Sequence, residues 1–174
     1  YFNQVSTSAY LEFPLNAALN AVLFVFSVIN ALYLDRLGFT LRIFYGFIAM
    51  AACLGALPVL YALHSLRVIG DTAYYWLLIA DASLLGAADA CAQASLYGVT
   101  SAACPPLYTQ ALMQGVSVCG TSVTLLRVVI KLFIRDVLLS SHLFFAGCAL
   151  YCLVSAAQYA VIRLRYPLFR RFLN

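Results

Sequence analysis

An acid and several amides interrupt an apolar run of this 174-residue chain, in residues 88–115, ADACAQASLYGVTSAACPPLYTQALMQG. Asp89, Gln93 and Thr100 would lie within about 40° of one another on an α-helix, because each residue turns the helix by about 100°. Polar groups in lipid are costly unless they face a partner or water. This helix face therefore indicates either a polar contact between helices or a wet cavity that binds a polar solute.

Two other segments carry similar polar stripes, each within about 80° of a helix. The first contains Asn16, Asn20, Ser27 and Asn30, and the second contains Gln110, Gln114, Ser117, Thr121 and Thr124. One interpretation is that these side chains hydrogen-bond between the helices of a scaffold that transports nothing. Stripes on three helices, with an acid among them, favour a shared wet cavity. We therefore expect substrate-binding residues in these stripes, including Asn16, Gln114 and Ser117.

The sequence contains no pattern typical of catalysis or of metal binding. Its six cysteines form no CxxC pair and no ligand spacing with His64 or His142, and there is no HExxH, GxSxG or phosphate-loop motif. We therefore expect no enzyme, no metal site and no cofactor. The net charge of +4 comes from basic residues at the ends of apolar runs, which is typical of membrane topology rather than of nucleic-acid binding.

The elements that would position these residues are five apolar runs. The chain is 65% hydrophobic and 9% charged, with a mean hydropathy of +0.96. A membrane-spanning helix needs about 20 apolar residues. The runs that qualify are residues 15–34, 43–63, 73–103, 107–131 and 137–162. We therefore predict an all-α, polytopic membrane protein with five transmembrane helices in one membrane domain, residues 1–174.

Two adjacent prolines predict the arrangement of the third and fourth runs. Pro105 and Pro106 cannot continue a helix, so they mark a tight turn between antiparallel helices. Gln93 lies twelve residues before Pro105, about 18 Å along a helix, which is near the middle of a roughly 30 Å core. Transporters commonly place substrate sites there. Asp81 and Arg127 are 24 and 22 residues from the turn, so we expect an ion pair near the outer boundary.

The placement of basic residues predicts the orientation. Six arginines lie on the side of the first connection, the proline turn and the C-terminal tail: 36, 42, 163, 165, 170 and 171. We therefore expect this side to be cytoplasmic and residues 1–13 to be outside. A chain that begins outside at Tyr1, without Met or a signal peptide, suggests a fragment of a larger carrier that lacks at least one preceding helix.

The hairpin resembles the fourth and fifth helices of the equilibrative nucleoside transporter family. The residues that carry the resemblance are Asp89-x-x-x-Gln93-x-Ser95-x-x-Gly98, Pro105-Pro106-x-Tyr108-Thr109, Met113-x-Gly115, Gly120, Arg127 and Lys131. Phe13-Pro14-Leu15-Asn16 also looks like the entry to the family's second helix. The resemblance implies helices two to six of an eleven-helix carrier, which moves nucleosides and sometimes nucleobases by alternating access.

The resemblance also implies roles for single residues. Gln93 matches a position that hydrogen-bonds the nucleobase, and Leu15 is similar to a base-contacting position. Ser95, Gly115 and Gly120 match positions that line or pack the path. Helix packing or gating is expected of Gly98, Asp81, Arg127 and Lys131. Ser117 stands where the family often has a glycine. Asp89 replaces a residue that is small in some members, so its role could be proton-linked, structural or neither, while its polar stripe places it among the expected substrate-binding residues.

The segment LDRLGFTLR, residues 34–42, resembles the Asp-Arg-x-Gly loop of the major facilitator superfamily. Asp35 and Arg36 could latch helices together in one state, although arginines are common in any short cytoplasmic loop. The expected architecture is a partial major-facilitator-like bundle. Its expected partners are a nucleoside or nucleobase, the lipid bilayer and the carrier's remaining helices, and the expected membrane is the plasma membrane. A carrier half for another small polar solute and a membrane scaffold are the alternatives.

Overall fold

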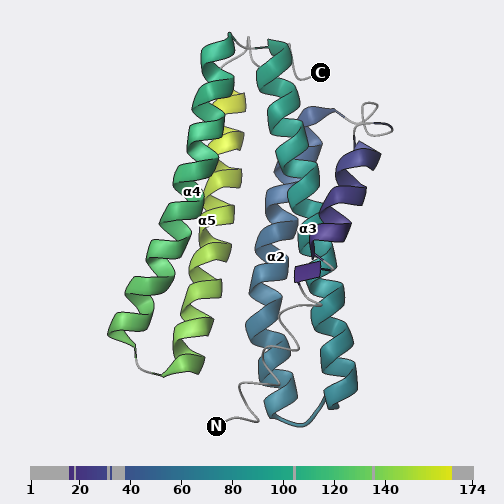
Figure 1. The fold of residues 1–174 in the computed structure, drawn as a ribbon, viewed down its shortest axis with the longest axis vertical. Coiled ribbons are helices and arrows are strands. Elements are labelled where there is room, and N and C mark those ends of the chain that lie inside the picture. Colours follow the sequence, from purple (N-terminus) through teal and green to yellow (C-terminus); the bar gives the residue numbers. More distant parts are fainter. Residues whose placement is uncertain are drawn as a thin grey trace.

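The computed structural model describes residues 16–165 apart from 18, 31, 33–37, 104 and 135. Four long helices follow one another: α2 (Phe39–Ser65), α3 (Asp71–Ala103), α4 (Pro106–Phe133) and α5 (Val137–Arg165) (Figure 1). All four are long and apolar enough to cross a membrane, and a shorter apolar helix, Leu19–Asn30, precedes them. The prediction of an all-α, polytopic membrane protein is therefore confirmed.

The helices extend beyond the apolar runs that predicted them. α2 begins at Phe39 rather than at Ile43, and α5 continues to Arg165, beyond Ile162. A helix satisfies its own backbone hydrogen bonds, so it can continue past the point where charged residues end the apolar run. The ends of the predicted first span, residues 15–34, lie outside the described residues, within which its helix runs from Leu19 to Asn30.

A tight connection joins α2 to α3. Arg67 has a left-handed backbone, with φ at 57°, and the Val68 N–H donates to the Leu63 carbonyl oxygen at 3.1 Å. This is the hydrogen bonding of a Schellman motif, in which a residue with positive φ ends the helix. His64 Nε2 then lies 2.9 Å from Asp71 Oδ1, across the connection. The corner between the two helices is therefore held by backbone geometry and by the hydrogen bond between His64 and Asp71.

Glycines allow two helices to lie close against α3. A Cβ atom on Gly46 of α2 would come within 3.0 Å of the Ala92 Cβ and 3.2 Å of the Ala88 carbonyl oxygen. A Cβ atom on Gly86 would lie 2.8 Å from the carbonyl oxygen of Leu19, in the short first helix. Side chains larger than hydrogen at these two positions would push the helices apart.

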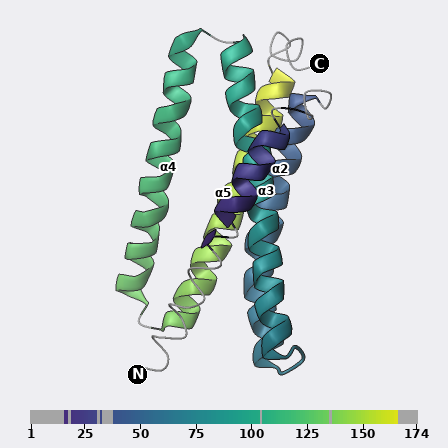
Figure 2. The same ribbon diagram turned by 45° about the vertical axis from the view of Figure 1, so that its right-hand side comes forward.

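α5 packs against α2 more extensively than against α4, and Figure 2 shows the last turns of α5 beside α2 and α3 while α4 stands apart. The α2–α5 contact contains the buried residues Ile43 and Tyr159, with Val99 of α3 beside them. α4, by contrast, has no buried residue, and it diverges from α3 with distance from the proline turn (Figure 2). α3 and α4 therefore run antiparallel, as predicted, but they are not packed together along their length.

Candidate functional site

The polar face of α3 holds one hydrogen-bonded pair. Gln93 Nε2 donates to both carboxylate oxygens of Asp89, at 3.2 Å from Oδ1 and 3.1 Å from Oδ2. The two side chains meet because residues four apart are neighbours on a helix surface. Asp89 is partly buried, whereas Gln93 is exposed. Within the described part of the chain Gln93 Oε1 accepts no hydrogen bond, so the amide is held at one end and open at the other.

Thr100, the third residue of this face, contributes less to it. Its hydroxyl donates to the carbonyl oxygen of Leu96 at 2.9 Å, within its own helix. A hydroxyl that bonds its own backbone in this way is already satisfied. The open polar groups of the face are therefore those of Asp89 and Gln93.

Ser95 and Gly98 lie away from the Gln93 face. Ser95 is 0% exposed, and its hydroxyl donates to the Cys91 carbonyl oxygen at 2.6 Å. Two residues along a helix correspond to a turn of about 200°, so Ser95 points away from Gln93. A Cβ atom on Gly98 would come within 2.9 Å of the Phe39 ring of α2. Both residues therefore lie where helices pack together, and the structure does not bring Ser95 beside the amide.

The expected α4 residues all lie on an open helix. Gln114, Ser117 and Lys131 are exposed, and the Ser117 hydroxyl donates to the Met113 carbonyl oxygen at 3.2 Å. Cβ atoms on Gly115 and Gly120 would meet nothing within 4 Å. Unlike Gly46 and Gly86, these two glycines therefore take part in no close helix contact in this structure.

The ion pair predicted between Asp81 and Arg127 is not formed. Among the described residues, the acid within salt-bridge distance of a basic side chain is Asp71, which contacts His64 and not an arginine. Asp81 lies beside Cys53 of α2, and the guanidinium of Arg127 lies 5.6 Å from the centroid of the Phe144 ring on α5. The prediction was wrong because matching depth gives proximity only if the helices stay together, and α4 diverges from α3 (Figure 2).

Asp81 instead lines a cavity of about 760 Å³ between α2, α3 and α5, to which Leu19 of the short first helix also contributes. Its Oδ2 atom is buried and has no hydrogen-bond partner among the described residues. Pro58, inside α2, also lines this cavity, and so does His142 of α5, whose ring meets Tyr61 edge to face. The sequence pointed to none of these neighbours, because the cavity depends on how three helices meet.

A buried arginine was also missed. Arg42 is 7% exposed, its Nη1 donates to Asn30 Oδ1 at 2.7 Å, and its guanidinium lies 4.8 Å from the centroid of the Phe39 ring. Its Nε and Nη2 atoms have no partner in the described part of the chain. From the sequence, Arg42 was a charge at the cytoplasmic boundary. Its burial follows from the first helix, which places Asn30 against it.

The remaining expected residues lie at the edge of the described residues or outside them. Leu15, Asp35 and Arg36 are outside the described residues. Asn16 is exposed, and its carbonyl oxygen accepts a hydrogen bond from Asn20 Nδ2 at 2.8 Å. Within the described ranges no group of three or more His, Cys, Asp or Glu residues could hold a metal ion.

Comparison with known proteins assigns a family to the second half of the chain. Residues 79–171 match the family described as Nucleoside transporter. The match begins within α3, extends beyond α5, and includes Asp89 and Gln93. No curated protein and no solved structure matches the chain.

Proposed function

Because the chain belongs to the nucleoside transporter family, we propose that it carries nucleosides, and also nucleobases, across a membrane by alternating access. Its helices make it an integral, multi-pass membrane protein. In alternating access the substrate site stays near the middle of the membrane while the helices around it open to one side and then to the other. Membership of a carrier family points to a protein without enzymatic activity.

The observation that carries this proposal is the Asp89–Gln93 pair, which lies within the family match. An amide has one oxygen acceptor and two N–H donors. Asp89 engages the nitrogen, so the oxygen and the second N–H are left for a ligand. That combination of one acceptor beside one donor is what the hydrogen-bonding edge of a nucleobase requires. A neutral base can thus bind without bringing a counter-charge into the membrane.

The pair also favours one of the two orientations of the Gln93 amide. A carboxylate accepts hydrogen bonds and donates none, so it favours the orientation of Gln93 with nitrogen toward Asp89. The amino group and the ring nitrogen of adenine present a donor and then an acceptor, whereas the corresponding groups of hypoxanthine present an acceptor and then a donor. A fixed amide therefore fits one of these edges better than the other. Asp89 acts in this proposal as a positioning residue for Gln93.

Other contacts and the orientation complete the proposal. Gln114 and Ser117, on the open face of α4, are further substrate contacts, together with Leu15 and Asn16 near the start of the chain. Arg163 and Arg165 end α5 at the same side as the proline turn, which supports a cytoplasmic location for this side. The membrane proposed is the plasma membrane.

Gln93→Leu tests the function in the complete protein expressed in cells. Leucine keeps most of the bulk but removes both donor and acceptor. Losing such a bond to a buried substrate costs about 1–3 kcal/mol, which is about ten- to a hundredfold in apparent affinity. Uptake kinetics for a panel of nucleosides should show this loss, unequally for purines and pyrimidines, while surface labelling shows near-normal abundance.

Gln158→Leu is the matched control, because Gln158 is an exposed glutamine of α5 on a different helix. It should leave every affinity unchanged. Unchanged affinities in Gln93→Leu for all nucleosides would reject the assignment of Gln93 to the site. Loss of the variant from the membrane, with normal affinity in what remains, would make Gln93 a structural residue. A substrate panel that includes other small polar solutes distinguishes a nucleoside carrier from a carrier of another class.

A further inference from the structure

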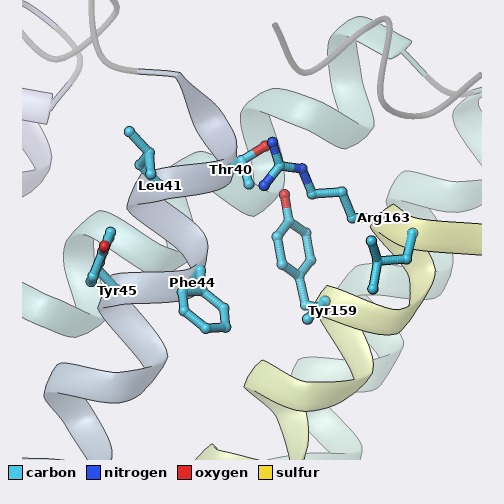
Figure 3. Close-up of a pocket in the computed structure, with 8 residues that line it drawn as sticks. Thr40, Leu41, Phe44, Tyr45, Tyr159 and Arg163 are labelled. Carbon is cyan, nitrogen blue, oxygen red and sulfur yellow. The ribbon is translucent and has the colours of Figure 1, made fainter. Parts of the chain in front are cut away.

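A second pocket lies between the first turns of α2 and the last turns of α5. It has a volume of about 470 Å³ and is lined by Thr40, Leu41, Phe44, Tyr45, Tyr159, Ala160, Arg163 and Leu164. Figure 3 shows Thr40 and Tyr159 pointing toward each other across the pocket, with the side chain of Arg163 between them and the end of α5. The pocket is distant in sequence from Asp89 and Gln93, and it lies near the ends of the helices rather than at their centres.

Two hydroxyl groups of this pocket are buried and together keep a free donor. Thr40 is 6% exposed and Tyr159 is 8% exposed. Neither Thr40 Oγ1 nor Tyr159 Oη makes a hydrogen bond of ordinary length and angle within the described part of the chain, although the two hydroxyls lie close enough to interact. A bond between them would use only one of the two O–H groups, so at least one donor on this wall has no acceptor. Both residues line the pocket, and a ligand with acceptor atoms would satisfy that donor.

Arg163 gives the pocket its charge. The residue is partly buried, close enough to Tyr159 to interact with it electrostatically, and makes no ion pair with the acids of the described chain. Arginine donates through a planar fork that matches carboxylate and phosphate groups. A guanidinium with two hydroxyl donors is therefore suited to an anion with several oxygens, and phosphate is the anion most abundant at a membrane surface.

The rim of the pocket is apolar and open. Leu41 and Leu164 are 52% and 82% exposed, and Phe44 lies deeper between the helices. A soluble anion would gain nothing from these side chains. A lipid would gain contact for its acyl chains, while its headgroup reaches the arginine at the end of the helix. Basic pockets between membrane helices on the cytoplasmic side bind anionic headgroups in this way.

We propose that this pocket binds the phosphate headgroup of an anionic phospholipid, with Arg163, Thr40 and Tyr159 as hydrogen-bond donors. Two simpler explanations account for only part of the structure. A basic residue in the last turn of a helix is favourable anywhere, because it faces the negative end of the helix dipole. That explains Arg163 but not the two hydroxyls. Water would satisfy the hydroxyls but would gain nothing from the apolar rim.

Native mass spectrometry of the complete protein, titrated with phosphatidylserine or with phosphatidylcholine, tests the proposal. The protein should retain phosphatidylserine preferentially, because both lipids carry the phosphate but the choline of phosphatidylcholine places a cation beside it, which Arg163 repels. Arg163→Ala should weaken its binding by about tenfold or more, and Arg163→Lys by less. Tyr159→Phe and Thr40→Val, which remove a hydroxyl at nearly constant size, should each weaken binding by about two- to tenfold. These two variants keep the test valid if Arg163→Ala does not fold.

Arg165→Ala is the matched control, because it removes a basic residue from the same helix end without changing the pocket lining. It should leave the preference for phosphatidylserine unchanged. Equal retention of both lipids, an Arg165→Ala effect as large as that of Arg163→Ala, or full binding in both hydroxyl variants would overturn the proposal. Displacement of the lipid by glycerol phosphate would assign the site to a soluble phosphate instead. None of these results depends on whether the protein transports nucleosides.

Discussion

Asp89→Asn should change the substrate preference of the protein more than its overall affinity. Hydrogen bonds to charged groups contribute about 1.5–3 kcal/mol. The Gln93 nitrogen lies 3.2 and 3.1 Å from the two carboxylate oxygens, at the long end of the usual range, which favours the lower value, about 1.5 kcal/mol. This corresponds to a roughly tenfold preference for the amide orientation with nitrogen toward Asp89.

Asparagine at position 89 both donates and accepts, so it accommodates either orientation of the Gln93 amide. The observed orientation then falls from about nine-tenths to about half of the population, and the flipped one rises from about a tenth to about half. A nucleoside that fits the observed orientation loses about twofold in apparent affinity, and one that fits the flipped orientation gains about fivefold. The affinity ratio between adenosine and inosine should therefore move about tenfold toward unity.

Inhibition of labelled adenosine uptake by unlabelled adenosine and inosine measures this ratio. Asp81→Asn is the control, because it removes a carboxylate about two turns earlier on α3 without altering Gln93. The ratio should change in Asp89→Asn and stay constant in Asp81→Asn. A constant ratio in Asp89→Asn, combined with a lost preference in Gln93→Leu, would refute the positioning role of Asp89.

Three further predictions concern stability, measured as thermal unfolding of the purified protein. Asn30→Leu removes the hydrogen bond that Arg42 makes at 2.7 Å and should lower the free energy of unfolding by about 1.5–3 kcal/mol. Adding Arg42→Met should restore part of this loss. No restoration would mean that Arg42 is needed for another reason. Gly46→Val should cost about 1–3 kcal/mol, because a Cβ atom there already lies 3.0 Å from Ala92, and Ala92→Gly should relieve it in part. Arg67→Gly should raise the melting temperature, since glycine adopts a positive φ without the cost of about 1 kcal/mol that other residues incur. A lower melting temperature in this variant would contradict the assumed backbone strain at Arg67.

The helices could be predicted from the sequence because hydropathy and length are local properties. The Asp89–Gln93 face could be predicted as well, since a separation of four residues determines which side chains share a helix face. The hydrogen bonding between the Asp89 and Gln93 side chains could not be predicted, because a spacing of four residues allows a contact without requiring one. The hydrogen bonds supply that detail, and they support the positioning role proposed for Asp89.

Predictions that needed the relative placement of helices failed or were missed. Depth along the helices suggested a partner for Asp81, but the lateral distance to Arg127 depends on where α4 lies. Arg42 was counted among the boundary charges, although it is buried and hydrogen-bonded to Asn30 of another helix. Ser95 stays a candidate residue that lines or packs the path, and its complete burial on α3 was not foreseen. Each of these outcomes depends on contacts between helices, for which a single sequence contains no direct pattern.

The return of α5 to α2 imposes an order on the synthesis of the protein. α2 and α3 are neighbours in the chain, so their contact can close soon after both have been made. α5 ends at Arg165, about 100 residues after Ser65, and ribosomes add about 5–20 residues per second. About 5–20 s therefore pass between the synthesis of α2 and that of Tyr159, and during this time the face of α2 around Ile43 is exposed to lipid or to the insertion machinery. A slower passage through the codons of α4 lengthens that exposure without changing the structure that results.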